Sequence, residues 1–296
     1  MSCRIYMDHA ATTEMLPEVR EAMEPYLREE YGNASTSYDM GVRMHDAIEE
    51  AREKIAWVID AQPEEIFFTS GGSESDNWVI KSVAGEKKNS GKHLITTRIE
   101  HHAVLRSCQY LESLGYEVTY LDVDDYGLVS AKEVVHALRE DTTLVSVMTG
   151  NNEIGTIEPI ADIGAQLRAR GIAFHTDAVQ AAGHVEIDVN KMKIDLLSIS
   201  AHKFHGPKGV GALYARKGVI LRSLIKGGAQ ERGKRAGTEN VPAIVGMAVA
   251  LTEAVENMSA NAKKLISMRE RLIEGLEKIP HCVLNGDRKQ RLPGHV

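Results

Sequence analysis

The sequence predicts an α/β fold, in which a mostly parallel mixed sheet carries helices on both faces. Short apolar runs alternate with stretches of helical periodicity over most of the chain. Each helical stretch is long enough to return the chain, so the next strand can run parallel to the one before it. Two later strands are joined by only nine residues. That link is too short for a helical crossover, and we expect an antiparallel pair in the same sheet.

The helices are expected where apolar residues recur every three or four positions. The first begins at Pro17, because the first turn of a helix tolerates proline. The predicted helical ranges are 17–30, 39–59, 74–84, 102–114, 130–139, 160–170 and 244–278, with a break near 257–261 in the last. The predicted strands are 65–69, 93–96, 117–121, 143–148, 172–176, 195–200 and 210–214, with a further strand starting at Cys282.

Composition limits the classes of function. The formal net charge of the 296 residues is −7 at pH 7, whereas non-specific nucleic-acid binding needs an excess of Lys and Arg. The longest apolar stretch, near 243–251, is far shorter than the ~20 residues of a membrane-spanning helix. The first residues also lack the apolar core of a secretory signal. We therefore expect a cytoplasmic globular protein that binds neither nucleic acid nor membranes.

The three cysteines, Cys3, Cys108 and Cys282, include no close pair. The sequence therefore predicts neither a disulfide framework nor a metal site. Cys108 falls within a predicted helix and Cys282 at the start of a predicted strand, so we expect both to be buried structural thiols. Cys3, close to the terminus, gives no functional signal.

The candidate site lies in the residues that follow each strand, because ligands of open α/β sheets bind at the carboxyl ends of the strands. Ser70-Gly-Gly-Ser-Glu74 joins a strand to a helix. Its glycines and the free amides of the helix N-terminus can cradle a phosphate. The alternative is an ordinary tight turn. The segment matches neither a Walker A motif nor the dinucleotide-binding glycine motif.

Three further strand ends carry reactive side chains: His101, Asp177 and Lys203. One histidine of the adjacent pair His101 and His102 can face a cofactor ring or carry a proton, or else only cap a helix or lie at the surface. Asp177 is costly to bury unless it meets a cation such as a protonated heterocyclic nitrogen, although Asp is also a common helix cap. A desolvated Lys203 can form a Schiff base, whereas an exposed one is a surface lysine. Together with the phosphate cradle, these groups are those that bind pyridoxal phosphate.

An ordered series of motifs runs along the chain: YMDHAATT (6–13), GN (32–33), TSGGSESDN (69–77), EH (100–101), NNEIG (151–155), HTDAVQ (175–180), SAHK (200–203), GPKG (206–209), ERGKRAGTEN (231–240) and LNGD (284–287). With this series the sequence resembles the cysteine desulfurases, the NifS/IscS-like family of the class V aminotransferase group. The resemblance covers essentially the whole chain.

The resemblance implies a fold-type-I enzyme that depends on pyridoxal 5'-phosphate and works as a homodimer. Lys203 would hold the cofactor as a Schiff base and move the Cα proton. Asp177 would pair with the ring nitrogen, and His101 would stack on the ring and assist proton transfer. The residues implied to bind the phosphate are Gly72, Ser73, Ser200, His202 and, from the other subunit, Thr238. Asn152 and Gln180 would lie near the ring and its phenolic oxygen.

The implied reaction converts L-cysteine to L-alanine and passes the sulfur, as an enzyme persulfide, to acceptor proteins for Fe–S cluster assembly, tRNA modification or thio-cofactors. The nucleophilic Cys of the family and the Arg that binds the substrate carboxylate are expected beyond Val296. We expect a large domain at 14–256, with 1–13 and 257–296 forming part of a small α+β subdomain that is incomplete. The alternatives are a pyridoxal-phosphate-binding and dimerisation fragment without desulfurase activity, a selenocysteine lyase or an aminotransferase.

Overall fold

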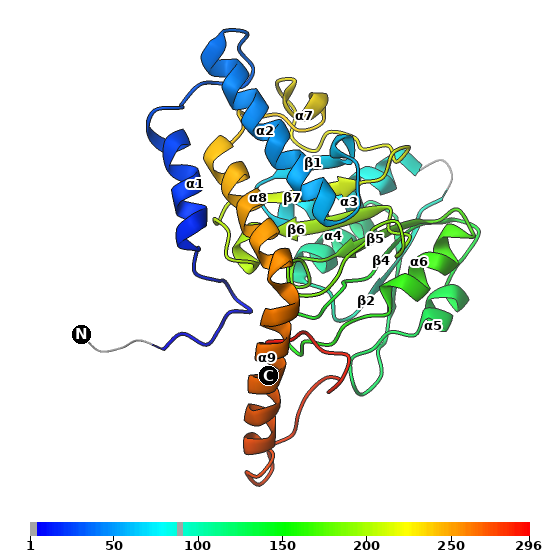
Figure 1. The fold of residues 1–296 in the computed structure, drawn as a ribbon. Helices are drawn as coiled ribbons and strands as arrows, with labels where there is room; N and C mark the ends of the chain where they lie inside the picture. Colours follow the sequence, from blue (N-terminus) through cyan, green and yellow to red (C-terminus); the bar gives the residue numbers. More distant parts are fainter. Residues whose placement is uncertain (1–4, 88–90) are drawn as a thin grey trace.

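The structure, a computed structural model, describes residues 5–87 and 91–296; Cys3 lies outside these ranges. In the described residues, seven strands form one sheet in the order β1-β7-β6-β5-β4-β2-β3 (Figure 1). The strands are β1 (Ile66–Thr69), β2 (His93–Thr97), β3 (Glu117–Leu121), β4 (Thr142–Ser146), β5 (Ala173–Asp177), β6 (Leu196–Ser200) and β7 (Gly211–Ala215). Strands β2 to β6 are parallel. The predicted antiparallel β6–β7 pair is confirmed, and β1 also pairs antiparallel with β7.

The helices of the described chain follow the predicted order. They are α1 (Pro17–Arg28), α2 (Asp39–Val58), α3 (Gly72–Lys87), α4 (His102–Ser113), α5 (Ala131–His136), α6 (Ile160–Arg168), α7 (Gln230–Gly233), α8 (Val241–Glu256) and α9 (Met258–Leu276), with short 3-10 turns η1 (Pro63–Glu65) and η2 (Ala201–Lys203). The predicted break in the last helix is confirmed at Asn257, between α8 and α9. None of the single helices described has the length and apolarity that a membrane crossing requires. Helices α8 and α9 meet these two requirements only when they are taken together, and the angle between them is 69°.

Two apolar cores hold the helices on the two faces of the sheet, as the fold class predicts. Helices α1, α2, α5, α6 and α8 share one core with side chains such as Phe174 and Tyr214. Helices α3 and α4 share the other, where Trp78 packs edge-to-face on Phe67 with 5.7 Å between ring centroids. Successive residues of a strand point to opposite faces, which is why strands β1 and β7 contribute to both cores.

Three local expectations are wrong. The helix expected at 130–139 is confirmed only for Ala131–His136. No strand begins at Cys282: its amide donates to the Ile279 carbonyl at 3.1 Å, and His281 has φ +66°, so the chain forms a turn there. Cys282 is therefore partly exposed rather than buried. Cys108 is buried as expected, and burial raises its thiol pKa to about 12.

A buried ion pair joins α2 to α7. The Arg52 guanidinium donates two hydrogen bonds of 2.9 Å to the Glu231 carboxylate, and both side chains are 3% exposed. Glu231 also accepts a hydrogen bond of 2.8 Å from the Phe68 amide, and Arg52 donates one of 2.8 Å to the Ile66 carbonyl. The pair thus fixes α7 to β1, although Glu231 and Arg232 both have positive φ, a conformation that costs free energy outside glycine.

We expect Glu231→Gln to lower the free energy of unfolding by about 1–3 kcal/mol, because it removes the buried charged partner of Arg52 and leaves only Glu49, which is 40% exposed and 3.1 Å away. The double variant Arg52→Met/Glu231→Leu should recover much of that loss, since neither charge remains. Urea denaturation measures both. Arg98→Gln is the matched control, because the ion pair that Arg98 forms with Asp122 is exposed. This substitution should change the free energy of unfolding by less than about 1 kcal/mol. A double variant as unstable as the single one would contradict this account.

Candidate active site

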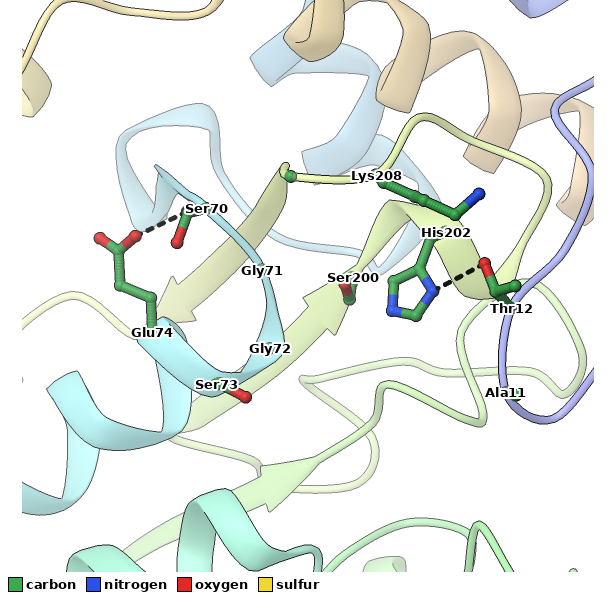
Figure 2. A pocket seen from close by; sticks show the side chains of 11 residues that line it. Ala11, Thr12, Ser70, Gly71, Gly72, Ser73, Glu74, Ser200, His202 and Lys208 are labelled. Carbon is green, nitrogen blue, oxygen red and sulfur yellow. Dashed lines mark hydrogen bonds between the residues drawn. The ribbon is translucent and has the colours of Figure 1, made fainter.

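A cavity of about 420 Å³ opens at the carboxyl ends of β1 and β6 (Figure 2). The turn after β1 forms one wall, and η2 with the N-terminal segment forms the other. Its lining residues are Ala11, Thr12, Ser70, Gly71, Gly72, Ser73, Glu74, Ser200, His202, Lys208 and Gly209. Small residues and hydroxyl groups predominate, which suits a compact anion rather than an apolar ligand.

The turn at Gly71 and Gly72 requires glycine. Gly71 has φ +145°, and a Cβ on Gly72 would lie 2.5 Å from Cγ2 of Val179. Gly72 is the first residue of α3, so the free amides at the helix N-terminus lie at this wall of the cavity, where they favour an anion. The geometry is therefore that of the predicted cradle rather than of an unconstrained turn.

Two basic side chains, His202 and Lys208, also line the cavity; the His202 ring points toward the cradle, whereas the Lys208 side chain extends away from it (Figure 2). Burial, assisted by the charges of Lys203 and Lys208, lowers the pKa of His202, and its Nδ1 lies 3.2 Å from the Thr12 hydroxyl. Lys208 is exposed and carries its charge at the cavity mouth. The motif series contained Thr12 and Lys208 without giving either a role. The signal for Lys208 was a cation within the GPKG segment (206–209), which closely follows Lys203.

Lys203 is half-buried in η2, and its amine is held by the N-terminal segment. It donates to the Ala11 carbonyl at 3.0 Å and also to the Ala10 carbonyl. The Gln180 amide donates to the same Ala10 carbonyl at 2.9 Å. Burial lowers the pKa of Lys203, against the opposing charge of Asp177. The structure thus brings Lys203 and Gln180 together through a segment far away in sequence.

The N-terminal segment is itself fixed on the turn that carries Lys203. The amide and the hydroxyl of Thr13 both donate to the His202 carbonyl at 2.9 Å. The Thr13 hydroxyl in turn accepts from the His205 amide at 2.7 Å. Residues 10–13 therefore form part of the site wall and hold η2 in place.

Asp177 ends β5 with 5% exposure. One of its oxygens accepts a hydrogen bond of 2.9 Å from the Val179 amide, so it caps the following turn. One carboxylate oxygen of Asp177, one of Asp76 and one ring nitrogen of His101 all lie within 4.8 Å of one another. Burial raises the pKa of Asp177, while His101 and Lys203 act in the opposite direction. Both alternatives for Asp177 hold at once: it is a local cap and a buried acid near cationic groups.

The remaining candidate residues are more dispersed. His101 is exposed, and its Nδ1 accepts from the Ala103 amide at 3.1 Å, which caps α4. Asn152 lies in the loop after β4 and donates to Glu153 at 2.7 Å. Thr238, after α7, is exposed and does not line the cavity of its own chain. Four predicted phosphate residues, Gly72, Ser73, Ser200 and His202, line one cavity.

These residues fit pyridoxal phosphate. Free helix amides, hydroxyls and Lys208 suit the phosphate, Asp177 suits a protonated ring nitrogen, and an amine of lowered pKa suits Schiff-base chemistry. The fold is that of fold-type-I pyridoxal-phosphate enzymes: the chain superposes on a NifS-like protein with a TM-score of 0.96 at 44% identity, over 98% of this chain and 80% of that one.

Sequence comparison agrees with the fold. The class-V aminotransferase model matches residues 5–296. A cysteine desulfurase IscS of Methanosarcina thermophila is 55% identical over 292 residues, which cover 99% of this chain and 72% of the relative. One from Clostridium botulinum is 54% identical over 299 residues, covering 100% and 75%. The chain therefore belongs to the cysteine desulfurases of the class-V aminotransferase family.

A further solved structure is titled SspA in complex with cysteine. It superposes with a TM-score of 0.82 at 45% identity, over 84% of this chain and 72% of that one.

We expect Gly72→Ala to weaken pyridoxal phosphate binding by about tenfold, because relieving an overlap in packed surroundings costs roughly 1–3 kcal/mol. Gly85→Ala in the same helix is the matched control, since a Cβ there meets no atom within 4 Å. Equilibrium titration followed by visible absorbance measures the affinity. Equal affinities of the two variants would show that the close approach at Gly72 is irrelevant to binding.

Proposed function

We propose that this protein binds pyridoxal phosphate at the cavity and converts L-cysteine to L-alanine, passing the sulfur as a persulfide to acceptor proteins in the cytoplasm. One observation carries the proposal. The Lys203 amine, with its pKa lowered by burial, lies on the turn that also supplies His202 to the phosphate cradle. The cysteine desulfurase relatives and the cysteine complex of a similar structure support L-cysteine as the substrate.

When bound, pyridoxal phosphate supplies an electron sink that stabilises negative charge at the substrate Cα. Lys203 would hold the cofactor through its amine and later move the Cα proton, because a lowered pKa increases the neutral fraction that can accept one. Asp177 would keep a proton on the ring nitrogen. His101 would lie against the ring, where Nε2, the ring nitrogen that does not cap α4, can exchange a proton with the substrate.

The phosphate would bind to the first amides of α3 and to the Ser73, Ser200 and His202 side chains. A neutral His202 can donate a hydrogen bond without adding charge, so Lys208 would supply the positive charge at the mouth. Gln180 would contact the phenolic oxygen of the cofactor, and Asn152 would lie near the ring. Gln180 is already fixed to the Ala10 carbonyl at 2.9 Å, so this arrangement needs little reordering of its side chain.

Cys108 is excluded as the sulfur-accepting nucleophile. Only the thiolate attacks sulfur, and burial raises the Cys108 pKa to about 12. The burial of Cys108 is compatible with a second candidate, a pyridoxal-phosphate-binding module that does not release sulfur by itself, although Cys282 is partly exposed. The two candidates share the cofactor site and differ in the product from L-cysteine.

Residues 1–296, supplied with pyridoxal phosphate, should show a visible absorption band that Lys203→Ala abolishes. Lys208→Ala should keep the visible band but need a several times higher cofactor concentration for the same intensity, since only a phosphate contact is lost. If alanine forms from L-cysteine, Lys203→Ala should slow it by roughly 10²–10⁴-fold, the usual contribution of a general base. Alanine and sulfide assays measure the reaction.

A wild-type protein that stays colourless with added pyridoxal phosphate would contradict the proposal. A coloured protein that forms no alanine would favour the binding module. Alanine formed only from selenocysteine, or exchange between an amino acid and a keto acid, would assign a lyase or an aminotransferase instead.

The homodimer is part of the same proposal. Thr238 is exposed outside its own cavity, and the Arg52–Glu231 pair holds the segment that carries it, which suits a residue that serves the partner's phosphate. Thr238→Ala should weaken pyridoxal phosphate binding by about tenfold, the value of one hydrogen bond to a charged group. Light scattering should show a dimer for both proteins. A monomeric wild type with full affinity would contradict a role in the partner.

A further inference from the structure

A second carboxyl group, Asp76, is buried beneath the proposed cofactor site. It lies on the second turn of α3 and is 1% exposed. Neither carboxylate oxygen receives a well-aligned hydrogen bond from any described residue. An oxygen of Asp76 nevertheless lies within 4.8 Å of an oxygen of Asp177. The proposed reaction gives Asp76 no part, so its burial needs a separate explanation.

Among the described residues, no lysine or arginine forms an ion pair with Asp76. The closest basic group is His175, whose Nε2 is 3.6 Å from Asp76 Oδ1. Burial lowers the pKa of His175 to about 3, and its two ring nitrogens already contact Ser146 at 2.8 Å and Ser198 at 3.0 Å. His175 is therefore neutral at physiological pH and cannot pair with an anion.

The other titratable neighbours differ between the two acids. Glu100, at the end of β2, opposes a negative charge on Asp76, and burial raises its own pKa to about 8. Lys203 and His101 act on Asp177 and favour its ionised form. Two adjacent buried carboxylates cannot both ionise without compensation. The charge of Lys203 acts on Asp177, whereas a ring nitrogen of His101 lies within 4.8 Å of both acids and does not distinguish them.

The direction of the shared proton follows. Burial and then the charge of Asp177 raise the pKa of Asp76 well above its ordinary value. Contact between the two carboxyl groups raises the pKa of Asp76 and lowers that of Asp177. The proton is thus held on Asp76 rather than on Asp177, whose ionised form Lys203 favours.

We propose that Asp76 is a neutral carboxylic acid at physiological pH and donates a hydrogen bond to the Asp177 carboxylate. Asp76 is then a positioning residue: it orients Asp177 and stabilises its anionic form in a buried site. The consequence for the cofactor rests on the proposed function, because an ionised Asp177 is what a protonated ring nitrogen requires. Asp76→Asn is the informative variant, since the amide also donates and is also neutral.

The first experiment uses the protein without cofactor. The infrared difference spectrum between wild type and Asp76→Asn at neutral pH should show the C=O band of one protonated carboxylic acid in the wild type. The wild type should also lose stability relative to Asp76→Asn as pH rises from about 4, because a carboxyl whose folded pKa is raised contributes stability only at low pH. A carboxylate band in the difference spectrum, or a pH-independent stability difference, would overturn the proposal.

The second experiment uses the protein loaded with pyridoxal phosphate. Asp76→Asn should bind it within about twofold of wild type, and the pH at which the visible band changes should stay the same. Asp76→Leu, which removes the donor at similar volume, should bind about tenfold more weakly. If Asp76→Asn bound pyridoxal phosphate as weakly as Asp76→Leu, the proposal would be overturned. Such a result would mean that binding requires a charged Asp76 rather than a neutral donor. A wild type that binds no cofactor would refute the proposed function, while the infrared result would still decide the state of Asp76.

Discussion

The burial of the Asp177 carboxyl at the end of β5 is the constraint on which the site depends. A carboxylate in such a position needs donors and nearby positive charge. The neighbouring β6 ends in the turn that carries Lys203, and His101 caps the helix that follows β2. Helix α3 brings Asp76 to the same place. The reactive groups therefore converge because parallel strands end at one edge of the sheet.

The rest of the molecule fixes these strand ends in place. The N-terminal segment is bonded to both Lys203 and the backbone of His202, so the turn is held from outside the sheet. The Arg52–Glu231 pair ties α7 to α2 and β1, directly before the cradle at Gly71 and Gly72. A site built on such rigid elements can keep a lysine partly desolvated, which a mobile loop could not do.

The membership in the cysteine desulfurases agrees with the chemistry of the cavity. Its polar wall, glycine turn and adjacent amine suit a phosphorylated cofactor that reacts through an aldehyde. The proposed pairing of Asp76 with Asp177 extends this picture below the ring, where a neutral acid would stabilise the charge of its neighbour. Cys108, the one fully buried thiol among the described residues, is unsuited to attack sulfur, because burial raises its pKa to about 12.

The sequence alone determined the fold class, the order of the elements and most of their ends, because hydrophobic periods, glycine turns and capping residues act locally. It also identified Gly72, Asp177, Lys203 and the other strand-end candidates, since chemistry at a strand end has a positional signal. Only the tertiary structure decided the place of β1 beside β7, the contact of Gln180 and Lys203 with Ala10, 170 and 193 residues away, the closeness of Asp76 to Asp177, and the partly exposed turn at Cys282. Such contacts depend on which segments the assembled sheet brings together, and that information is not carried by any local pattern of residues.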